Sequence, residues 1–251
     1  MIKQALIVGG TTGIGKATAE LLLKDGIEVI ILARPNKNLE KTEKELSALG
    51  TVKSVALDLS DLNAVKTFTK SMATQMPNLH YLLNAAGYFS PKSFLEHTEE
   101  DYDIYHDFNK AFFLITQAAA NILKNNGGGS IVNIGSMWAK QAIKATPSSA
   151  YSMAKAGLHS FTQHLAMELA EYNIRVNAVS PAVVVTPIYS SFIESDKIED
   201  TLQGFNDFHP IGRVGRPIDI ANSIHFLMSD KSSWVTGAIW DVDGGIMAGR
   251  N

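Results

Sequence analysis

The sequence predicts an α/β fold in which a doubly wound parallel sheet of about seven strands carries helices on both faces. Short apolar runs rich in β-branched residues alternate along the chain with longer segments of helical pattern, which is typical of this class. Several of the runs are apolar at consecutive positions, as expected of strands covered on both sides. A glycine-rich loop joins the first run to the first helical segment.

The predicted strands follow in order from the apolar runs. They span residues 4–10, 28–33, 52–59, 79–87, 130–136, 174–181 and 238–245. The first helix is expected to begin near Gly13 and end at Gly26, and the second to run from about Asn36 to Gly50. Ser60 is the expected N-cap of a third helix. Because no repeat or linker interrupts the alternation, residues 1–251 are predicted to form a single domain.

The composition narrows the function classes. With 45% hydrophobic and 19% charged residues, the 251-residue chain reads as an ordinary globular protein. Its formal charge of −3 gives no basic footprint for nucleic acid, and the absence of cysteine excludes disulfides, thiol nucleophiles and cysteine-bound zinc. The seven histidines lack metal-ligand spacing, so no metal is expected. No apolar run is long enough to span a membrane, and no leader pattern precedes the first strand, so the expected location is the cytoplasm.

The loop "LIVGGTTGIGKAT" places glycines at 9, 13 and 15 between the first strand and the first helix. Glycines there let the backbone turn tightly and approach a pyrophosphate, which the helix N-terminus favours electrostatically. A rival interpretation shares these residues, because Gly10 to Lys16 fits the start of a P-loop. That motif needs Ser or Thr next to ligate Mg²⁺, and Ala17 has no oxygen to offer. A P-loop phosphotransferase is therefore the less favoured alternative.

The end of the second strand indicates which dinucleotide the loop would bind. It reads "ILARPNK", with Arg34 and no acidic residue to accept hydrogen bonds from a free ribose 2′-hydroxyl. The Arg34 guanidinium can instead pair with a 2′-phosphate, which favours NADP(H) and leaves NAD(H) possible. The alternative is that Arg34 is a solvated loop charge. Asp58 closes the third strand, where it can meet the adenine edge or cap the next helix.

Tyr151 and Lys155 lie four residues apart in "SSAYSMAKAGLHS" (148–160), so on a helix both side chains leave the same face. A cation ~5 Å from the phenol at an effective dielectric of ~20 contributes about 3 kcal/mol, enough to lower the tyrosine pKa by roughly two pH units. Tyr151 would then suit proton transfer near neutral pH. A plain surface pair is the alternative for these two residues taken alone.

Further stretches follow in an ordered series along the chain. They are "GGTTGIG" (9–15), "LDLSD" (57–61), "NAAG" (84–87), Asn109 in a long helix, "IVNIGS" (131–136), "YSMAK" (151–155), "IRVNAVSP" (174–181) and "PIGRVGRPIDIA" (210–221). In order and spacing this series resembles the short-chain dehydrogenase/reductase family over essentially the whole chain. The resemblance implies a Rossmann-like NAD(P)-dependent oxidoreductase that transfers a hydride between NADP(H) and a carbonyl or alcohol substrate.

The same resemblance implies the roles of individual residues. Tyr151 would be the general acid or base, Ser136 would hydrogen-bond the substrate oxygen, and Asn109 would anchor a water that relays the proton. Lys155 would also hold the nicotinamide ribose. The residues expected to bind the cofactor are Gly9, Thr11, Thr12, Gly13, Ile14, Gly15, Arg34, Asp58, Leu59, Asn84, Ala85, Gly87, Tyr151, Lys155, Pro181, Val184 and Thr186. A catalytically idle, dinucleotide-sensing protein of the same fold is the main alternative.

The chain departs from the family pattern in three places. Val8 stands where the family usually has Thr, Ala182 takes a glycine place after the sixth strand, and the segment 136–151 looks longer than usual. By resemblance, residues 187–210 would form a lid over an apolar substrate. The expected pocket side chains are Ile188, Tyr189, Phe192, Ile193, Phe205 and Phe208 from the lid, with Phe89, Met137 and Trp138 opposite.

Two expectations concern partners. Lys140 and Lys144 either meet an acidic group of the substrate or are solvated. The family resemblance also implies a homotetramer, built from the long helices around 98–125 and 149–172 and from the C-terminal strand.

Overall fold

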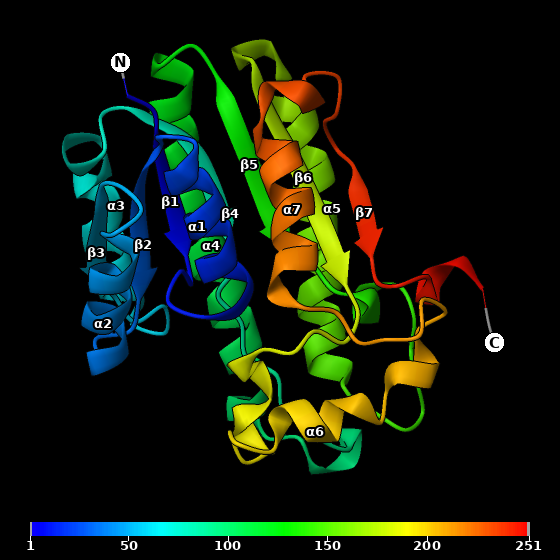
Figure 1. Cartoon of the computed structure of the whole chain (residues 1–251). Helices are drawn as coiled ribbons and strands as arrows, with labels where there is room; N and C mark the ends of the chain where they lie inside the picture. Colours follow the sequence, from blue (N-terminus) through cyan, green and yellow to red (C-terminus); the bar gives the residue numbers. More distant parts are fainter. Residues whose placement is uncertain (1, 250–251) are drawn as a thin grey trace.

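The computed structural model describes residues 2–249, which form one seven-stranded sheet between two layers of helices (Figure 1). The strand order is β3-β2-β1-β4-β5-β6-β7 and every neighbouring pair is parallel. The strands are β1 (Gln4–Val8), β2 (Glu28–Ala33), β3 (Val52–Ala56), β4 (Leu79–Asn84), β5 (Gly129–Ile134), β6 (Ile174–Pro181) and β7 (Ile239–Val242). The predicted fold class is confirmed.

Each face of the sheet packs against its own group of helices. One face is covered by α1 (Gly13–Lys24), α2 (Lys37–Leu46) and α7 (Pro217–Met228), which share an apolar core with the sheet. The other face is covered by α3 (Leu62–Gln75), α4 (Glu99–Asn125) and α5 (Ser149–Leu169). The short α6 (Ile198–Gln203) lies apart from both layers, below the carboxyl ends of the strands in Figure 1. None of the helices within residues 2–249 is long and apolar enough to cross a membrane.

Several strands end earlier than the sequence predicts. The first stops at Val8 rather than residue 10, and the fourth stops at Asn84 rather than residue 87. Of the residues that the prediction added to these two strands, Gly9, Ala85, Ala86 and Gly87 line the cavity described below. An apolar or small residue after a strand is therefore compatible with a binding loop as well as with a longer strand.

The third helix also begins differently from the prediction. Asp61, not Ser60, is its N-cap, and the Asp61 carboxylate accepts hydrogen bonds from the backbone N–H groups of Asn63 and Ala64. The Ser60 hydroxyl donates instead to the Asp58 carboxylate at 2.8 Å. A carboxylate one residue further along makes the better cap because its charge also favours the helix N-terminus.

The sheet divides at the boundary between β1 and β4. The chain leaves β1 for α1 on one face and leaves β4 for α4 on the other. Beyond this boundary the Val8 carbonyl accepts hydrogen bonds from the backbone N–H groups of Ala85 and Ala86, at 2.8 and 2.7 Å. Open parallel sheets bind ligands at such a switch point, outside the carboxyl ends of the strands.

Candidate active site

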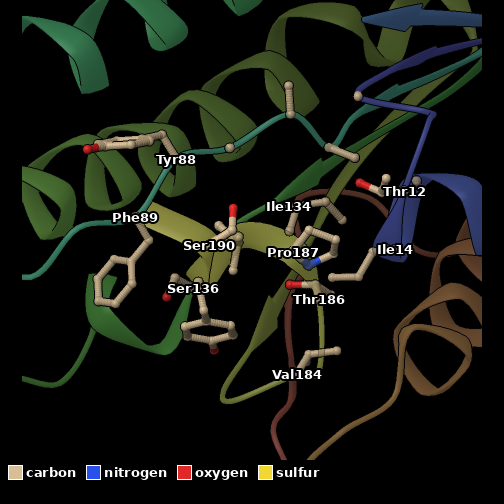
Figure 2. Close-up of a pocket in the computed structure, with 18 of the residues that line it drawn as sticks. Thr12, Ile14, Tyr88, Phe89, Ile134, Ser136, Val184, Thr186, Pro187 and Ser190 are labelled. Atoms are coloured by element: carbon tan, nitrogen blue, oxygen red, sulfur yellow. The ribbon is translucent and has the colours of Figure 1, made fainter. Parts of the chain in front are cut away.

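A cavity of about 820 Å³ opens at this switch point, a volume within the range of ligand and cofactor sites. The loop after β1 forms one wall, and residues following β6 lie opposite. Figure 2 shows Thr12 and Ile14 at the start of α1, across from Thr186 and Pro187, with Phe89 and Ser136 toward the other end.

The glycine loop has a shape that side chains would block. Gly9 has a φ of +92°, and a Cβ atom there would lie 2.5 Å from the backbone nitrogen of Ala86. A Cβ on Gly15 would lie 2.1 Å from the Gly9 carbonyl oxygen. The Thr12 side chain makes no capping hydrogen bond to α1, so the N–H groups of its first turn are left to an anion. The loop therefore fits the pyrophosphate of a dinucleotide.

Most residues predicted to contact the cofactor line this cavity. They are Gly9, Thr11, Thr12, Gly13, Ile14, Gly15, Arg34, Asp58, Leu59, Ala85, Gly87, Tyr151, Lys155, Pro181, Val184 and Thr186. Arg34 is exposed at the rim, and its charge contributes to the lowered pKa of Asp58, although hydrogen bonding from the Ser60 backbone contributes most. Ala182, in the family's glycine place, lines the cavity as well.

Asn84 is the exception among these residues. Its side chain is fully buried beneath the cavity, where the amide nitrogen donates to Thr116 Oγ1 at 3.0 Å and to Asn133 Oδ1 at 2.8 Å. Asn133 donates in turn to Thr162 Oγ1 at 2.9 Å. The side chain thus joins β4 to α4 and β5 rather than reaching the cavity. The sequence position at a strand end could not distinguish these two roles.

Tyr151, Ser136 and Lys155 converge at the end of the cavity. Tyr151 and Lys155 come from α5, and Ser136 follows β5 directly. The Ser136 hydroxyl hydrogen-bonds to the Tyr151 phenol. Lys155 Nζ lies 5.7 Å from the centroid of the Tyr151 ring and donates to the Ile134 carbonyl at 2.7 Å. All three side chains are buried.

Burial dominates the electrostatics of this group. Desolvation raises the pKa of Tyr151 above its usual value, and the hydrogen bond from Ser136 opposes this only in part. Desolvation also lowers the pKa of Lys155 to about 8. The sequence predicted a lowered pKa for Tyr151, and this was wrong for the folded chain without cofactor, where the pKa is raised. The prediction included the attraction between the Lys155 cation and a phenolate, but it left out the cost of burying the phenolate.

Two further residues stand close to this group. Asn109 on α4 lies outside the cavity lining, and its side-chain nitrogen donates to the Ala154 carbonyl of α5 at 2.8 Å. Tyr105, one turn earlier, was not anticipated from the sequence. Its ring lies 5.7 Å from that of Tyr151, and its hydroxyl group hydrogen-bonds with the backbone of Ser90. The four-residue spacing between Tyr105 and Asn109, on one helix face, was the signal available.

The P-loop alternative does not fit the structure. Lys16 Nζ lies 2.5 Å from the Glu45 carboxylate of α2 and does not line the cavity. A phosphate-binding lysine would have to point into the loop. Within residues 2–249 no cluster of side chains is suited to hold a metal ion.

The predicted lid contributes most of its expected side chains to the cavity. Those that line it are Ile188, Tyr189, Phe192, Ile193 and Phe205, with Phe89, Met137 and Trp138 from other segments. Phe208 was predicted to join them but does not line the cavity; it ends a short 3-10 helix, Asn206–Phe208, and its ring packs edge-on against that of His209 at 5.5 Å. Lys140 does not line it either, and its ammonium lies 2.7 Å from the Asp241 carboxylate. Lys144 is exposed beside the cavity-lining residue Ala145.

Fold and cavity together define a dinucleotide-binding α/β protein with a buried tyrosine–lysine pair. Residues 8–247 match the family model described as enoyl-(acyl carrier protein) reductase. The chain belongs to the short-chain dehydrogenase/reductase family.

Curated relatives cover nearly the whole chain. The chain is 35% identical over 248 residues to 3-oxoacyl-(acyl-carrier-protein) reductase of Thermotoga maritima, covering 98% of each chain. It is 33% identical over 247 residues to 3alpha-hydroxysteroid dehydrogenase of Mediterraneibacter gnavus, covering 96% of each chain. These relatives are named for substrates of different chemistry, so the family does not fix the substrate of this chain.

Solved structures give the same result for the fold. L-sorbose reductase of Gluconobacter frateurii, in complex with NADPH and L-sorbose, is 28% identical with a TM-score of 0.90, covering 99% of this chain and 97% of that chain. A protein described as a putative gluconate 5-dehydrogenase of Beutenbergia cavernae, with bound NADP, is 26% identical with a TM-score of 0.89, covering 98% and 97%. Both of these neighbours are described with a nicotinamide dinucleotide bound.

Proposed function

We propose that this protein is an NADP(H)-preferring reductase of carbonyl compounds, with Tyr151 as the catalytic acid. The observation that carries the proposal is the convergence of Tyr151, Ser136 and Lys155 at one end of a cavity whose other end is a glycine loop. When bound, the reduced dinucleotide supplies a hydride, which is one proton together with two electrons.

The protein's own residues supply the proton and position the carbonyl group of the substrate. The Tyr151 hydroxyl donates its proton to the carbonyl oxygen as the C=O π bond breaks and a C–H bond forms at carbon, giving the alcohol. The Ser136 hydroxyl hydrogen-bonds the same oxygen and stabilises its developing charge. Burial holds Tyr151 in its protonated form, so the phenol carries the proton that reduction of a carbonyl consumes. Asn109 joins α4 to α5 beside Tyr151 and Lys155 through its hydrogen bond to the Ala154 carbonyl. Its proposed role is to bind a water molecule that returns a proton to Tyr151.

The preference for NADP(H) rests on Arg34. It lies exposed at the cavity rim just after β2, where no carboxylate of that strand end is present to accept a ribose 2′-hydroxyl. The related structures with bound NADP and NADPH support the same choice. NAD(H) remains the secondary cofactor.

The testing experiment follows oxidation of NADPH and NADH by the purified protein with a panel of ketones. We expect turnover with NADPH, and a fall of roughly 10²- to 10⁴-fold in kcat for Tyr151→Phe with NADPH binding retained. Arg34→Ala should lower kcat/KM for NADPH by roughly tenfold and leave NADH nearly unchanged. Lys37→Ala, a neighbouring cation that does not line the cavity, is the matched control.

The outcomes separate the alternatives. Tight NADPH binding with no turnover of any ketone, and no change in Tyr151→Phe, would favour the dinucleotide-sensing protein. Turnover that favours NADH would keep the mechanism and remove the role of Arg34.

The assembly is proposed to be a homotetramer. Phe113 on α4 and Met153 and Met167 on α5 are 50%, 57% and 83% exposed, and Trp234, just before β7, is 98% exposed. Large apolar side chains gathered on these elements are suited to contacts between copies of the chain.

A further inference from the structure

The wall of the cavity next to Tyr151 is built around one aromatic residue, Phe89. Its ring centroid lies 4.9 Å from that of Tyr151, with the planes at 64°. It lies 5.9 Å from the ring of Phe192 and 6.4 Å from that of Tyr189, both edge-on. Tyr189 and Phe192 also meet each other edge-on at 6.0 Å. We call Phe89, Tyr189 and Phe192 the aromatic cap.

The aromatic cap joins two segments that are far apart in sequence. Phe89 lies in the loop between β4 and α4, whereas Tyr189 and Phe192 belong to the lid. The Ser191 hydroxyl donates to the Phe89 backbone carbonyl at 2.5 Å, so the lid is fastened to the Phe89 loop beside the rings. Phe89 is buried and Phe192 is 46% exposed, which places Phe89 against the reacting group and Phe192 toward solvent.

Within residues 2–249, few charged groups line the cavity and none of them belongs to the lid. Among the described residues, the Asp, Glu, Lys and Arg side chains that line it are Arg34, Asp58 and Lys155. The first two lie at the adenosine end and the third beneath Tyr151. The part under the lid is walled mainly by aromatic and aliphatic side chains, and its polar groups from the lid are the hydroxyls of Tyr189, Ser190 and Thr201. A charge on the substrate would therefore be buried there without an opposite charge.

The lid itself carries a negative charge. Residues 187–210 hold five carboxylates and one ammonium, that of Lys197. Lys197 is paired with Glu194, and the neighbouring Arg216 is paired with Glu199. An anionic substrate approaching under the lid would be repelled, whereas a neutral one would not.

We infer that the aromatic cap selects uncharged, ring-bearing ketones and rejects anionic acyl thioesters, with Phe89 as the specificity-determining residue. This inference rests on the proposed reductase function. Flat or cyclic substrates gain edge-to-face contact with the cap while their carbonyl oxygen reaches Tyr151 and Ser136. Small open-chain ketones fit the cavity but make little contact with the cap.

The test compares three probes with the NADPH-loaded enzyme: 1-tetralone as a neutral ring ketone, ethyl acetoacetate as a small neutral ketone, and acetoacetyl-CoA as an anionic thioester. We expect kcat/KM for 1-tetralone to exceed that for acetoacetyl-CoA by roughly tenfold or more. In Phe89→Leu, KM for 1-tetralone should rise by roughly tenfold while that for ethyl acetoacetate changes little. Phe94→Leu is the matched control, because Phe94 is 75% exposed and does not line the cavity.

A second variant guards against a folding defect in Phe89→Leu. Ser191→Ala removes the fastening hydrogen bond and should raise KM for 1-tetralone without changing KM for NADPH. Lys144→Ala should leave all three substrates unchanged, and a selective loss with acetoacetyl-CoA would mean that Lys144 receives an anionic substrate instead.

Failure of this inference is distinguishable from failure of the proposed function. If ethyl acetoacetate or acetoacetyl-CoA is reduced and 1-tetralone neither reacts nor binds in ligand-observed NMR, the reductase stands and the inference is overturned. Equal losses on every substrate in Phe89→Leu would also overturn it, since Phe89 would then be a structural residue. If no probe is reduced but 1-tetralone binds and Phe89→Leu weakens that binding, the cap is supported and the reductase function is not.

Discussion

Lys155 is a residue whose protonation the fold alters strongly. It is 9% exposed, and burial lowers its pKa from 10.5 to about 8. The ammonium has a hydrogen-bond acceptor in the Ile134 carbonyl but lines the cavity without a carboxylate partner. A buried charge without an opposite charge is costly to the folded protein, so its function is obtained at the expense of stability.

This cost predicts a pH dependence of stability. Between pH 8 and about 10 the unfolded chain binds more protons at Lys155 than the folded protein does, so the free energy of unfolding should rise with pH in that range. The contribution amounts to about 2–3 kcal/mol. Urea unfolding of the cofactor-free protein at pH 7.5 and 9.5 should show this rise, and Lys155→Met should flatten it.

The exposed residue Lys53 on β3 provides the control. Lys53→Met should keep the wild-type slope. A Lys155→Met protein whose stability follows pH in parallel with the wild type would contradict the lowered pKa. Above pH 10 the raised pKa of Tyr151 acts in the opposite direction and lowers stability as pH increases.

At the scale of elements, the turn from β1 to α1 contributes both to the junction of the sheet and to the proposed cofactor site. Two features of Gly9 require glycine at this position. Its φ is positive, and the backbone of Ala86 from the β4 loop lies where a side chain would be. The backbone N–H groups of Ala85 and Ala86 in the β4 loop also donate hydrogen bonds to the Val8 carbonyl at the end of β1. Cofactor binding and the junction of the two halves of the sheet therefore depend on one backbone shape.

Comparing Gly9→Ala with Gly26→Ala separates the cost of a left-handed backbone from the effect of a steric clash with Ala86. Both glycines have positive φ, +92° and +77°, but a Cβ on Gly26 would meet nothing within 4 Å. Each substitution should cost about 1–2 kcal/mol for the left-handed backbone. Gly9→Ala should cost more than that, because its Cβ would collide with the Ala86 backbone. Only Gly9→Ala should also raise the Kd for NADPH, by roughly tenfold or more, since a phosphate-binding turn depends on its backbone shape. Thermal melts with and without NADPH measure both effects, and equal shifts in the two variants would contradict this explanation.

At the scale of the whole molecule, the exposed apolar residues predict assembly. Mass photometry of the wild type should give a tetramer. Met167→Glu, at a position 83% exposed in the single chain, should shift it to smaller species without lowering the helix content measured by circular dichroism. Leu95→Glu alters an even more exposed residue outside α4 and α5 and serves as the control. A monomeric wild type, or an equal shift in both variants, would refute the proposed interface.

The sequence by itself determined the fold class and most of the residues that line the cavity. These depend on local chemistry. Parallel buried strands need continuous apolar runs, a tight phosphate-binding turn needs glycine, and helical spacing puts Tyr151 and Lys155 on one face. The family motifs added Ser136, which the structure places against Tyr151.

Only the tertiary structure decided which of these groups are desolvated and what surrounds them. The raised pKa of Tyr151, the buried position of Asn84 and the contact of Tyr105 with Tyr151 all depend on packing between separate elements. The hydrogen bond from Ser191 to Phe89 joins residues 102 positions apart. No local pattern encodes such a contact, because its distance and burial arise only when the lid and the β4 loop fold over the same end of the sheet.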